Sequence, residues 1–261
     1  MRKKLYIALA AVIILIAVAL IVTMSTNVAE SSIDPHINQL VPQSAMSQLS
    51  VPASISNRIG VGGVLYFPQK ISAPPLVNGT KPEILYIGAE YCPYCAVTRW
   101  GLIIALMRFG TFTNLKFMAS NETDVYPDTP TFDFYNSTYT SDYVSFVSVE
   151  TTTRNRNTDL QTPTPSQYSI FSKFNPQGGI PFIDFANKSL QLDAPVLPSV
   201  LQNQNWNTTL GNLTNINTSI SQSLVGSADV FTAQICLLTN NTPQSVCGQG
   251  YVLNIEKNNL R

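Results

Sequence analysis

The chain has 261 residues, a formal net charge of zero, and 11% charged residues, well below the quarter that is usual in globular proteins. Hydrophobic residues make up 44% of the sequence, enough for one sizeable core. Basic and acidic residues are equal at 15 each and no basic patch is present, so the composition argues against a nucleic-acid partner.

The first feature of the chain is an apolar run from Leu5 to Val22 without a charged residue. A run of this length is just sufficient to cross a bilayer as a helix. Arg2, Lys3 and Lys4 precede it, which places the N-terminus in the cytoplasm and the rest of the chain outside. A cleaved signal peptide begins in the same way, but it has a shorter apolar core and a close cleavage site. We therefore favour a retained membrane anchor over residues 1–24.

Two further features are consistent with export. Four cysteines, an even number, suit an oxidising compartment. Asn-x-Ser/Thr sequons are spread along the chain and suggest a glycosylated surface. The eight candidates are Asn78, Asn121, Asn136, Asn187, Asn207, Asn212, Asn217 and Asn240. We expect a single-pass membrane protein with an extracellular C-terminal domain.

Residues 25–60 are polar and punctuated by proline, as in an extracytoplasmic linker. His36 is the only histidine, and in a linker it is expected to be solvated rather than to bind a metal. The run from Val61 to Phe67 is predicted as the first strand of a domain that continues to residue 261.

The stretch from Glu83 to Phe109 is the most informative part of the chain. The apolar run Ile84–Ile87 predicts a strand, and the proline-free residues after Cys95 predict a helix. Pro93 suits the first turn of that helix. Cys92 then lies at the helix N-terminus, where unpaired N–H groups and the helix dipole stabilise a thiolate.

Cys92 and Cys95 are separated by two residues, a spacing that allows cycling between dithiol and disulfide. Half of a zinc site is the alternative. It would need a second pair of ligands at suitable spacing, which Cys236, Cys247 and His36 do not provide. We predict neither a metal nor a cofactor.

The next predicted strand, Leu115 to Ala119, completes a β-α-β unit. Residues 120–165 are irregular and are predicted as an insertion. Val144 to Val149 alternates like a half-buried strand, and Pro165 to Phe174 is predicted as a short helix. Aromatic residues in the insertion could bind a substrate peptide, but we favour a role as its local core. They are Phe132, Phe134, Tyr135, Tyr139 and Tyr143.

Two further segments follow. Ile180-Pro181 at the start of an apolar run marks a strand start, an edge or a cis bond. From Trp206 to Leu224 apolar residues recur at helical spacing, and Ser227 could cap another helix that ends near Leu238.

Cys236 and Cys247 form the second cysteine pair, in the region of C-terminal helices expected over residues 206–247. A bridge between them would close a small loop and stabilise the fold by ~2–3 kcal/mol. We favour this structural disulfide over a relay that exchanges electrons with Cys92 and Cys95.

The segment Ala89-Glu90-Tyr91-Cys92-Pro93-Tyr94-Cys95, followed downstream by Ile180-Pro181, resembles a thioredoxin fold, with the Pro-Tyr dipeptide of glutaredoxins. A larger set of motifs is similar to an uncharacterised family of membrane-anchored, thioredoxin-like proteins found chiefly in thermoacidophilic archaea and described as a domain of unknown function. These motifs are residues 86–96, 99–100, 108–112, 181–185, 235–239 and 245–247.

The resemblance implies an α/β, thioredoxin-like fold with an insertion between the second core strand and the second core helix. It makes Cys92 the attacking thiolate, Cys95 the resolving thiol and Pro181 a cis-proline that receives the substrate backbone. The supporting residues would be Glu90, Tyr91, Pro93, Tyr94 and Ile180. One residue departs from the pattern: thioredoxins have a buried aspartate six residues before the first cysteine, where this chain has Tyr86. An exposed Glu90 is the expected substitute.

The function expected from the resemblance is thiol–disulfide exchange on exported proteins, through a mixed disulfide and with a possible membrane redox partner. An acidic exterior would require an unusually low pKa for Cys92. The alternative is a non-enzymatic, glycosylated envelope scaffold or binding module with permanent disulfides. Copper handling is a third possibility, although no methionine or histidine ligands stand out.

Overall fold

Strand β3 (Lys81–Gly88) is the central strand of a six-stranded mixed sheet. The structure, a computed structural model, describes residues 36–260. The predicted anchor at residues 1–24 and the first part of the predicted linker lie outside the described residues. Within the sheet, β8 (Ser145–Glu150) runs parallel to β3 on one side, and β9 (Phe182–Phe185) runs antiparallel to it on the other.

The remaining strands extend the sheet or form two small separate ones. The sheet order is β1-β10-β9-β3-β2, with β1 at Gln69–Lys70, β10 at Ser189–Gln191 and β2 at Val77–Asn78. Two antiparallel pairs lie outside it: β4 (Gly110–Thr113) with β7 (Thr138–Ser141), and β5 (Lys116–Ala119) with β6 (Pro130–Asp133).

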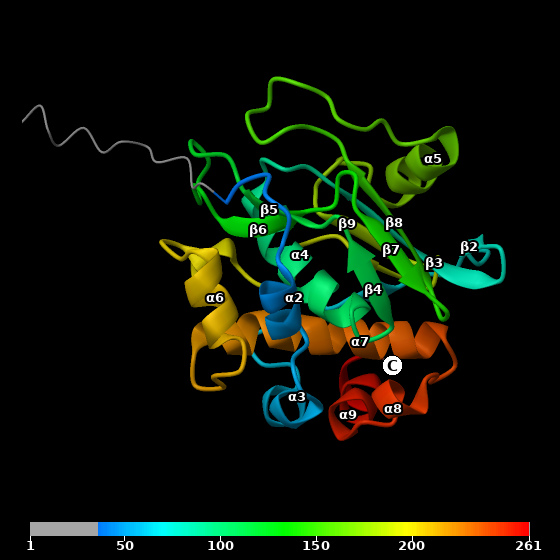
Figure 1. Ribbon diagram of the computed structural model, residues 1–261. Coiled ribbons are helices and arrows are strands. Elements are labelled where there is room, and N and C mark those ends of the chain that lie inside the picture. Colours follow the sequence, from blue (N-terminus) through cyan, green and yellow to red (C-terminus); the bar gives the residue numbers. More distant parts are fainter. Residues whose placement is uncertain (1–35, 261) are drawn as a thin grey trace, which may run out of the picture. The chain divides into compact units, whose positions relative to one another are not determined.

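Helices cover both faces of the sheet, as Figure 1 shows. The longest are α4 (Pro93–Leu106), α5 (Pro165–Phe174), α7 (Gly226–Leu238) and α9 (Gly250–Asn259). The shorter ones are α2 (Gln43–Leu49), α3 (Ala53–Ile59), α6 (Trp206–Asn212), α8 (Gln244–Cys247), a 3₁₀ helix at Pro198–Leu201 and a π-helical turn at Ser221–Val225.

Side chains of β3 alternate between two hydrophobic cores. Ile84 and Tyr86 belong to the larger core, which includes residues of α4 and α7. Leu85 and Ile87 belong to a smaller core, which is closed by Phe171 and its neighbours on α5. The strand is therefore apolar on both faces, because neither face meets water.

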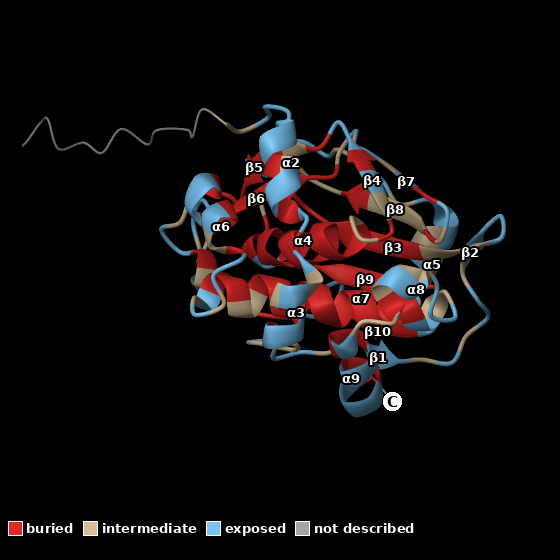
Figure 2. Ribbon diagram, turned by 60° about the horizontal axis from the view of Figure 1, so that its bottom comes forward, coloured by how far each residue is buried: buried red, intermediate tan, exposed pale blue. Residues whose placement is uncertain are grey.

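Helix α4 is buried at every position except Tyr94, as its largely red ribbon in Figure 2 shows, and it packs against α7 and β6. The two helices approach closely at Gly101, where a Cβ atom would lie 2.7 Å from the Cβ of Ser227. A helix buried all round needs apolar residues on every face, which explains why Arg99 is the only charged residue of α4.

Several predicted elements are confirmed. The strand, turn and helix expected over Glu83 to Phe109 are β3, the turn and α4. The helix Pro165–Phe174 is α5, and it begins with a capping box between Thr164 and Gln167. The aromatic residues of the insertion form core: Phe132 and Phe134 are 0% and 1% exposed.

The linker prediction is wrong for the part that is described. Residues 43–59 form α2 and α3, and Leu49 and Ile59 are buried in the larger core. Arg108, just after α4, donates to Ser56 on α3 at 2.9 Å and forms an ion pair of 2.8 Å with Asp229 on α7. These helices are short and mostly polar, so only packing against the domain makes them stable.

The strand predicted at Val61 to Phe67 is also wrong, since this segment contains no regular strand. Gly62 has a positive φ of 47°, and the N–H of Gly63 donates to the carbonyl of Gln222 at 2.9 Å. A bend that packs against the π-helical turn replaces the expected strand.

The second core strand is not the one predicted. Residues Leu115–Ala119 largely become β5, but β5 pairs with β6 outside the main sheet. The parallel partner of β3 is β8, so the β-α-β unit is β3-α4-β8. The predicted insertion at 120–165 therefore contains a strand of the main sheet. The segment that is inserted between α4 and β8 of the β-α-β unit is 107–144. Both strands are short and apolar, so local pattern alone does not distinguish them.

The helix predicted from Trp206 to Leu224 is interrupted. Helix α6 ends at Asn212, and a new helix passes through the π-helical turn into α7 without a break at Gly226. Ser227 is consequently inside a helix, where its Oγ donates to the carbonyl of Ser223, and does not cap one. Of the helices within residues 36–260, none combines the length and apolarity needed to cross a membrane.

Candidate active site

The turn between β3 and α4 holds both cysteines of the predicted dithiol. Cys92 is the N-cap of α4, and its Sγ accepts a 3.1 Å hydrogen bond from the backbone N–H of Cys95. Pro93 is the first helical residue, where a missing N–H leaves no helical hydrogen bond unmade. The sulfur of Cys92 therefore lies where a helix terminus favours negative charge.

The loop before β9 lies against Cys92. The Ile180–Pro181 peptide bond is cis, one of the alternatives predicted from the sequence. The thiol of Cys92 donates to the carbonyl oxygen of Ile180 at 3.8 Å, and Pro181 is buried. The structure thus brings together residues that are 88 positions apart in the chain.

The two thiols differ in acidity. A hydrogen bond from the Cys95 thiol, followed by backbone N–H groups and the charge of Arg99, lowers the pKa of Cys92 against the opposing effect of burial. Cys95 is completely buried; burial, and then the hydrogen bond and charge of Cys92, raise its pKa well above the ordinary value. Cys92 is therefore the thiol that ionises first. The hydrogen bond from the Cys95 thiol, which the sequence argument did not include, is the largest cause that lowers the pKa of Cys92.

A buried ion pair between α4 and β8 fixes the position of the turn that carries Cys92. Arg99 and Glu150 are both 0% exposed. Arg99 donates to the Glu150 carboxylate from Nε at 2.8 Å and from Nη2 at 2.6 Å, and Nη2 also donates to the carbonyl of Ala89 at 2.7 Å. This bidentate geometry places a fixed positive charge beside the dithiol. The charge of Arg99 acts to lower the pKa of both cysteines, although burial outweighs it at Cys95.

Sequence reasoning missed the pairing of Arg99 with Glu150. Arg99 is the only charged residue of α4, and Glu150 ends the apolar alternation of β8. The sequence offered one signal of a buried ion pair, a single charged residue within an apolar helix. Its partner became identifiable only from the parallel register, in which Gly88 lies opposite Glu150.

Two more carboxyl groups are buried near this ion pair. Glu90 is 6% exposed and accepts from the N–H of Arg154 at 2.8 Å, and Asp133 is 1% exposed. Burial, with the charges of Glu150 and Glu90, raises the pKa of Asp133 to about 8. With this pKa, the Asp133 carboxyl group is protonated at neutral pH. The expectation of an exposed Glu90 is wrong, because Arg154 and the inserted segment cover it.

Tyr86 is buried where the resemblance expects an aspartate. Its hydroxyl lies over Gly88, where a Cβ atom would come within 2.1 Å, so only glycine leaves room for it. The Arg99 guanidinium carbon is 5.8 Å from the ring centre. Within residues 36–260, neither the Tyr86 hydroxyl nor Arg99 Nη1 has a hydrogen-bond partner. Burial raises the pKa of Tyr86 well above its ordinary value, so this group remains a neutral donor.

Residues on both sides of Cys92 contact the loops 120–129 and 151–160. The carbonyl of Tyr91 accepts from the N–H of Asn121 at 2.9 Å, and the Arg156 guanidinium lies 4.4 Å from the Tyr91 ring centre. Tyr94 is 38% exposed and meets the ring of Tyr126 edge-on at 6.1 Å. The surface near the dithiol is therefore aromatic, and at its margin Arg154 and Arg156 form ion pairs with Glu122, Asp128 and Asp124.

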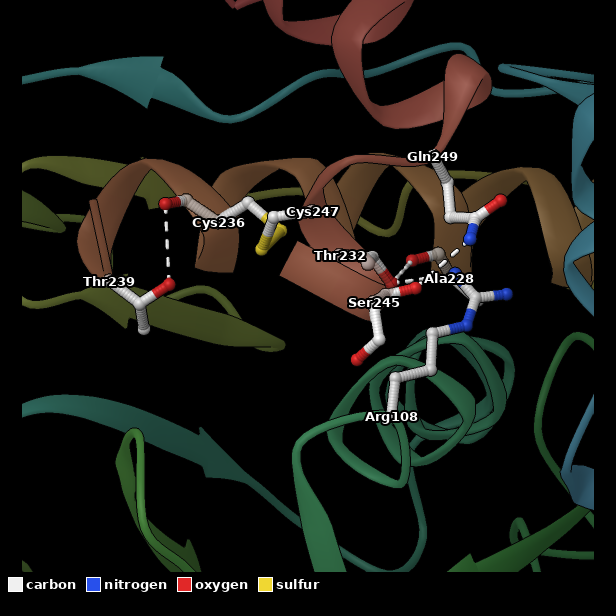
Figure 3. The surroundings of a disulfide bond; sticks show 8 residues. All are labelled: Arg108, Ala228, Thr232, Cys236, Thr239, Ser245, Cys247 and Gln249. Atoms are coloured by element: carbon white, nitrogen blue, oxygen red, sulfur yellow. Dashed lines mark hydrogen bonds between the residues drawn. A yellow bond between two sulfur atoms is a disulfide. The ribbon is translucent and has the colours of Figure 1, made fainter. Parts of the chain in front are cut away.

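The second cysteine pair forms the predicted disulfide. Cys236 on α7 and Cys247 on α8 are bonded at 2.01 Å with a Cα–Cα distance of 5.5 Å (Figure 3). Both residues are 0% exposed. Exchange requires access of an attacking thiolate to a sulfur atom, so this burial favours the structural interpretation over a relay.

The eight sequons differ in accessibility. Asn121 is buried: its amide donates to the carbonyl of Arg154 at 2.8 Å and its oxygen accepts from Thr123. The amides of Asn187 and Asn212 are also engaged with backbone carbonyls. The exposed candidates are Asn78, Asn136, Asn207, Asn217 and Asn240.

His36 is not the solvated histidine that was expected. Its ring is half-buried and lies 5.8 Å from the ring of Phe117 and 5.9 Å from that of Trp206. In the described part of the chain, no group of three or more His, Cys, Asp or Glu residues is arranged to hold a metal ion.

Comparison with protein families identifies one match. A family model described as a domain of unknown function (DUF929) matches residues 68–174. This range contains Cys92, Cys95, Arg99, Asp133 and Glu150, whereas Pro181 and the disulfide lie beyond it. Neither the curated proteins nor the solved structures give a significant match.

Removing one partner of the buried ion pair is predicted to be costly. In Arg99→Met, the Glu150 carboxylate is left buried without its counter-charge, and we expect a loss of about 3–5 kcal/mol in the free energy of unfolding. The double variant Arg99→Met/Glu150→Leu should recover most of this loss. It should not recover all of it, because the Ala89 carbonyl still lacks its hydrogen-bond donor. Urea denaturation measures both; the exposed Arg58→Met is the control. Equal losses in the single and double variants would contradict the assignment.

The raised pKa of Asp133 predicts a pH dependence of stability. The folded state binds this proton up to about pH 8, whereas an unfolded aspartate releases it near pH ~3.9. The resulting stabilisation is complete below the lower value and is lost as the pH rises to the higher one.

We therefore expect the free energy of unfolding to fall less between pH 4 and pH 8 in Asp133→Asn than in the wild type. Denaturant titrations at several pH values test this, with the exposed Asp142→Asn as the matched control. An unchanged slope in Asp133→Asn would refute the assignment.

Proposed function

We propose that this protein is a thiol–disulfide oxidoreductase of thioredoxin-like fold that acts on exported proteins outside the cell membrane. The observation that carries the proposal is the asymmetry of the cysteine pair. The Cys92 sulfur, at a helix N-terminus and 3.8 Å from the Ile180 carbonyl, has a lowered pKa, whereas Cys95 has a raised one; Cys92 is 4% exposed and Cys95 is 0% exposed. One nucleophilic and one resolving thiol are what exchange through a mixed disulfide requires.

The thioredoxin-like fold is supported by the arrangement around β3. The parallel unit β3-α4-β8, the antiparallel strands β9 and β10, and helices on both faces place the dithiol at the carboxyl end of a central strand. Ligands of open α/β sheets commonly bind at that end.

The reaction begins when the Cys92 thiolate attacks one sulfur of a substrate disulfide. An S–S bond forms between Cys92 and the substrate, and the other substrate sulfur leaves as a thiolate. Cys95 then loses its proton and attacks the Cys92 sulfur, releasing the second substrate thiol. Two electrons pass to the substrate, and a Cys92–Cys95 disulfide remains. The reverse sequence oxidises a substrate dithiol, and the partner's potential sets the direction.

The buried groups have complementary roles in this proposal. Arg99 stabilises the thiolate at either cysteine, since its charge lowers the pKa of both. Glu90 lies in the same turn as Cys92 and is buried beside the protonated Asp133, so the Glu90 carboxylate is suited to accept the Cys95 proton. Glu90 thus takes the part of the aspartate that Tyr86 replaces.

The proposed location and partners come from the sequence. An anchor at residues 1–24 would hold the domain at the outer face of the membrane, where a membrane redox partner could recycle the dithiol and glycans could occupy the exposed sequons. The competing proposal is a non-enzymatic glycosylated scaffold, which the buried disulfide and the exposed sequons would fit equally well.

Trapping of the mixed disulfide distinguishes the two proposals. In full-length Cys95→Ser, attack by Cys92 still occurs but resolution does not, so we expect covalent adducts with exported proteins that a reductant releases. The control is Cys92→Ser/Cys95→Ser, which keeps Cys236 and Cys247. Adducts in both variants, or in neither, would contradict the proposed exchange reaction.

A further inference from the structure

A cavity lies at the end of β3 that is far from the dithiol. Its volume is about 570 Å³, and its lining comes from β1, β10, the segment before β3 and the C-terminal end of α7. Pro82 of β3 is part of this lining, whereas Gly88 adjoins the redox turn. At ~3.3 Å per residue the two positions are about 20 Å apart, so the hollow is separate from the proposed active site.

The walls of the cavity are mainly aliphatic. Ile71 and Leu76 lie on one side, and Leu237 and Leu238 at the end of α7 lie on the other. Figure 2 shows β1 and β10 beside α7 in this region. The volume is within the range of roughly 300–1,000 Å³ that is typical of small-molecule sites. An apolar body is thus the type of ligand that these walls would accept.

The charged side chains that line the cavity are both positive. Lys70 and Lys188 are the only charged residues among the described residues that line it. In the pairing of β1 with β10, Lys70 lies opposite Ser189, the neighbour of Lys188, so both ammonium groups come from the same end of one strand pair. Neither lysine forms an ion pair within residues 36–260. Two uncompensated cations at an apolar hollow favour an anionic group.

A buried hydroxyl adds a third polar contact. Ser189 is 1% exposed and lines the cavity, and in the described part of the chain its Oγ has no hydrogen-bond partner. Buried polar groups are almost always paired in folded proteins, so an unpaired one at a cavity indicates a place for a ligand oxygen. Gln234, also buried, lines the same hollow.

We propose that this cavity binds a single amphiphilic molecule that has an apolar chain and a carboxylate or phosphate head. The chain lies against the leucine and isoleucine walls. The head lies between Lys70 and Lys188 and accepts a hydrogen bond from Ser189. The molecule is taken up from solution, not recognised as a head group within a bilayer. This site is independent of the proposed thiol chemistry.

Octyl phosphate is a suitable probe. We expect saturable binding to the full chain in phosphatidylcholine nanodiscs by calorimetry, after subtraction of empty nanodiscs. Inorganic phosphate, which lacks the chain, and 1-octanol, which lacks the charge, should each bind at least about tenfold more weakly. The Cys92→Ser/Cys95→Ser variant should bind like the wild type, which separates this test from that of the exchange reaction.

Substitution of the two exposed lysines tests the head-group contact without disturbing the core. Lys70→Gln/Lys188→Gln should weaken octyl phosphate binding at least about tenfold, whereas the control Lys173→Gln/Lys257→Gln on α5 and α9 should not. Wild-type affinity in the first variant, or equal affinity for inorganic phosphate, would overturn the proposal. So would binding to phosphatidylglycerol vesicles without saturable binding of octyl phosphate.

Discussion

The candidate site depends on the buried ion pair of Arg99 with Glu150. A guanidinium with no exposed surface is tolerable only when its charge is matched and most of its N–H groups are hydrogen-bonded; in Arg99 these are the groups on Nε and Nη2. Here Glu150 supplies the charge and the Ala89 carbonyl takes an additional hydrogen bond. One side chain therefore fixes three separate pieces of the chain: helix α4, the end of β8 and the turn that carries Cys92.

This ion pair explains much of the surrounding architecture. For Arg99 to be buried, α4 must be covered on all sides, and α7 provides that cover through the close approach at Gly101. The disulfide between Cys236 and Cys247 joins the end of α7 to α8. Burial, and then the negative charge of Glu150, raises the pKa of Asp133 to about 8, which keeps a proton close to the turn that carries Cys92. Packing and electrostatics thus support the same small region.

The features that the sequence could predict are formed by residues close together in the chain. The β3-turn-α4 unit, helix α5 and the Cys236–Cys247 bridge each follow from patterns within about 25 residues. What it missed depends on contacts between distant segments. Short polar helices at residues 43–59 are stable only by packing on the core. The choice of β8 over β5 as the partner of β3 depends on sheet register, and the burial of Glu90 depends on Arg154, 64 positions away.

The measurement that tests the central claim most directly is the redox potential of the Cys92/Cys95 pair in the full chain. It can be obtained by equilibration with glutathione buffers and quantification of the free thiols. An exchange-active dithiol with a stabilised Cys92 thiolate should have a potential above about −300 mV, within reach of cellular redox partners. A potential below about −300 mV would mean a permanent structural disulfide and would contradict the account.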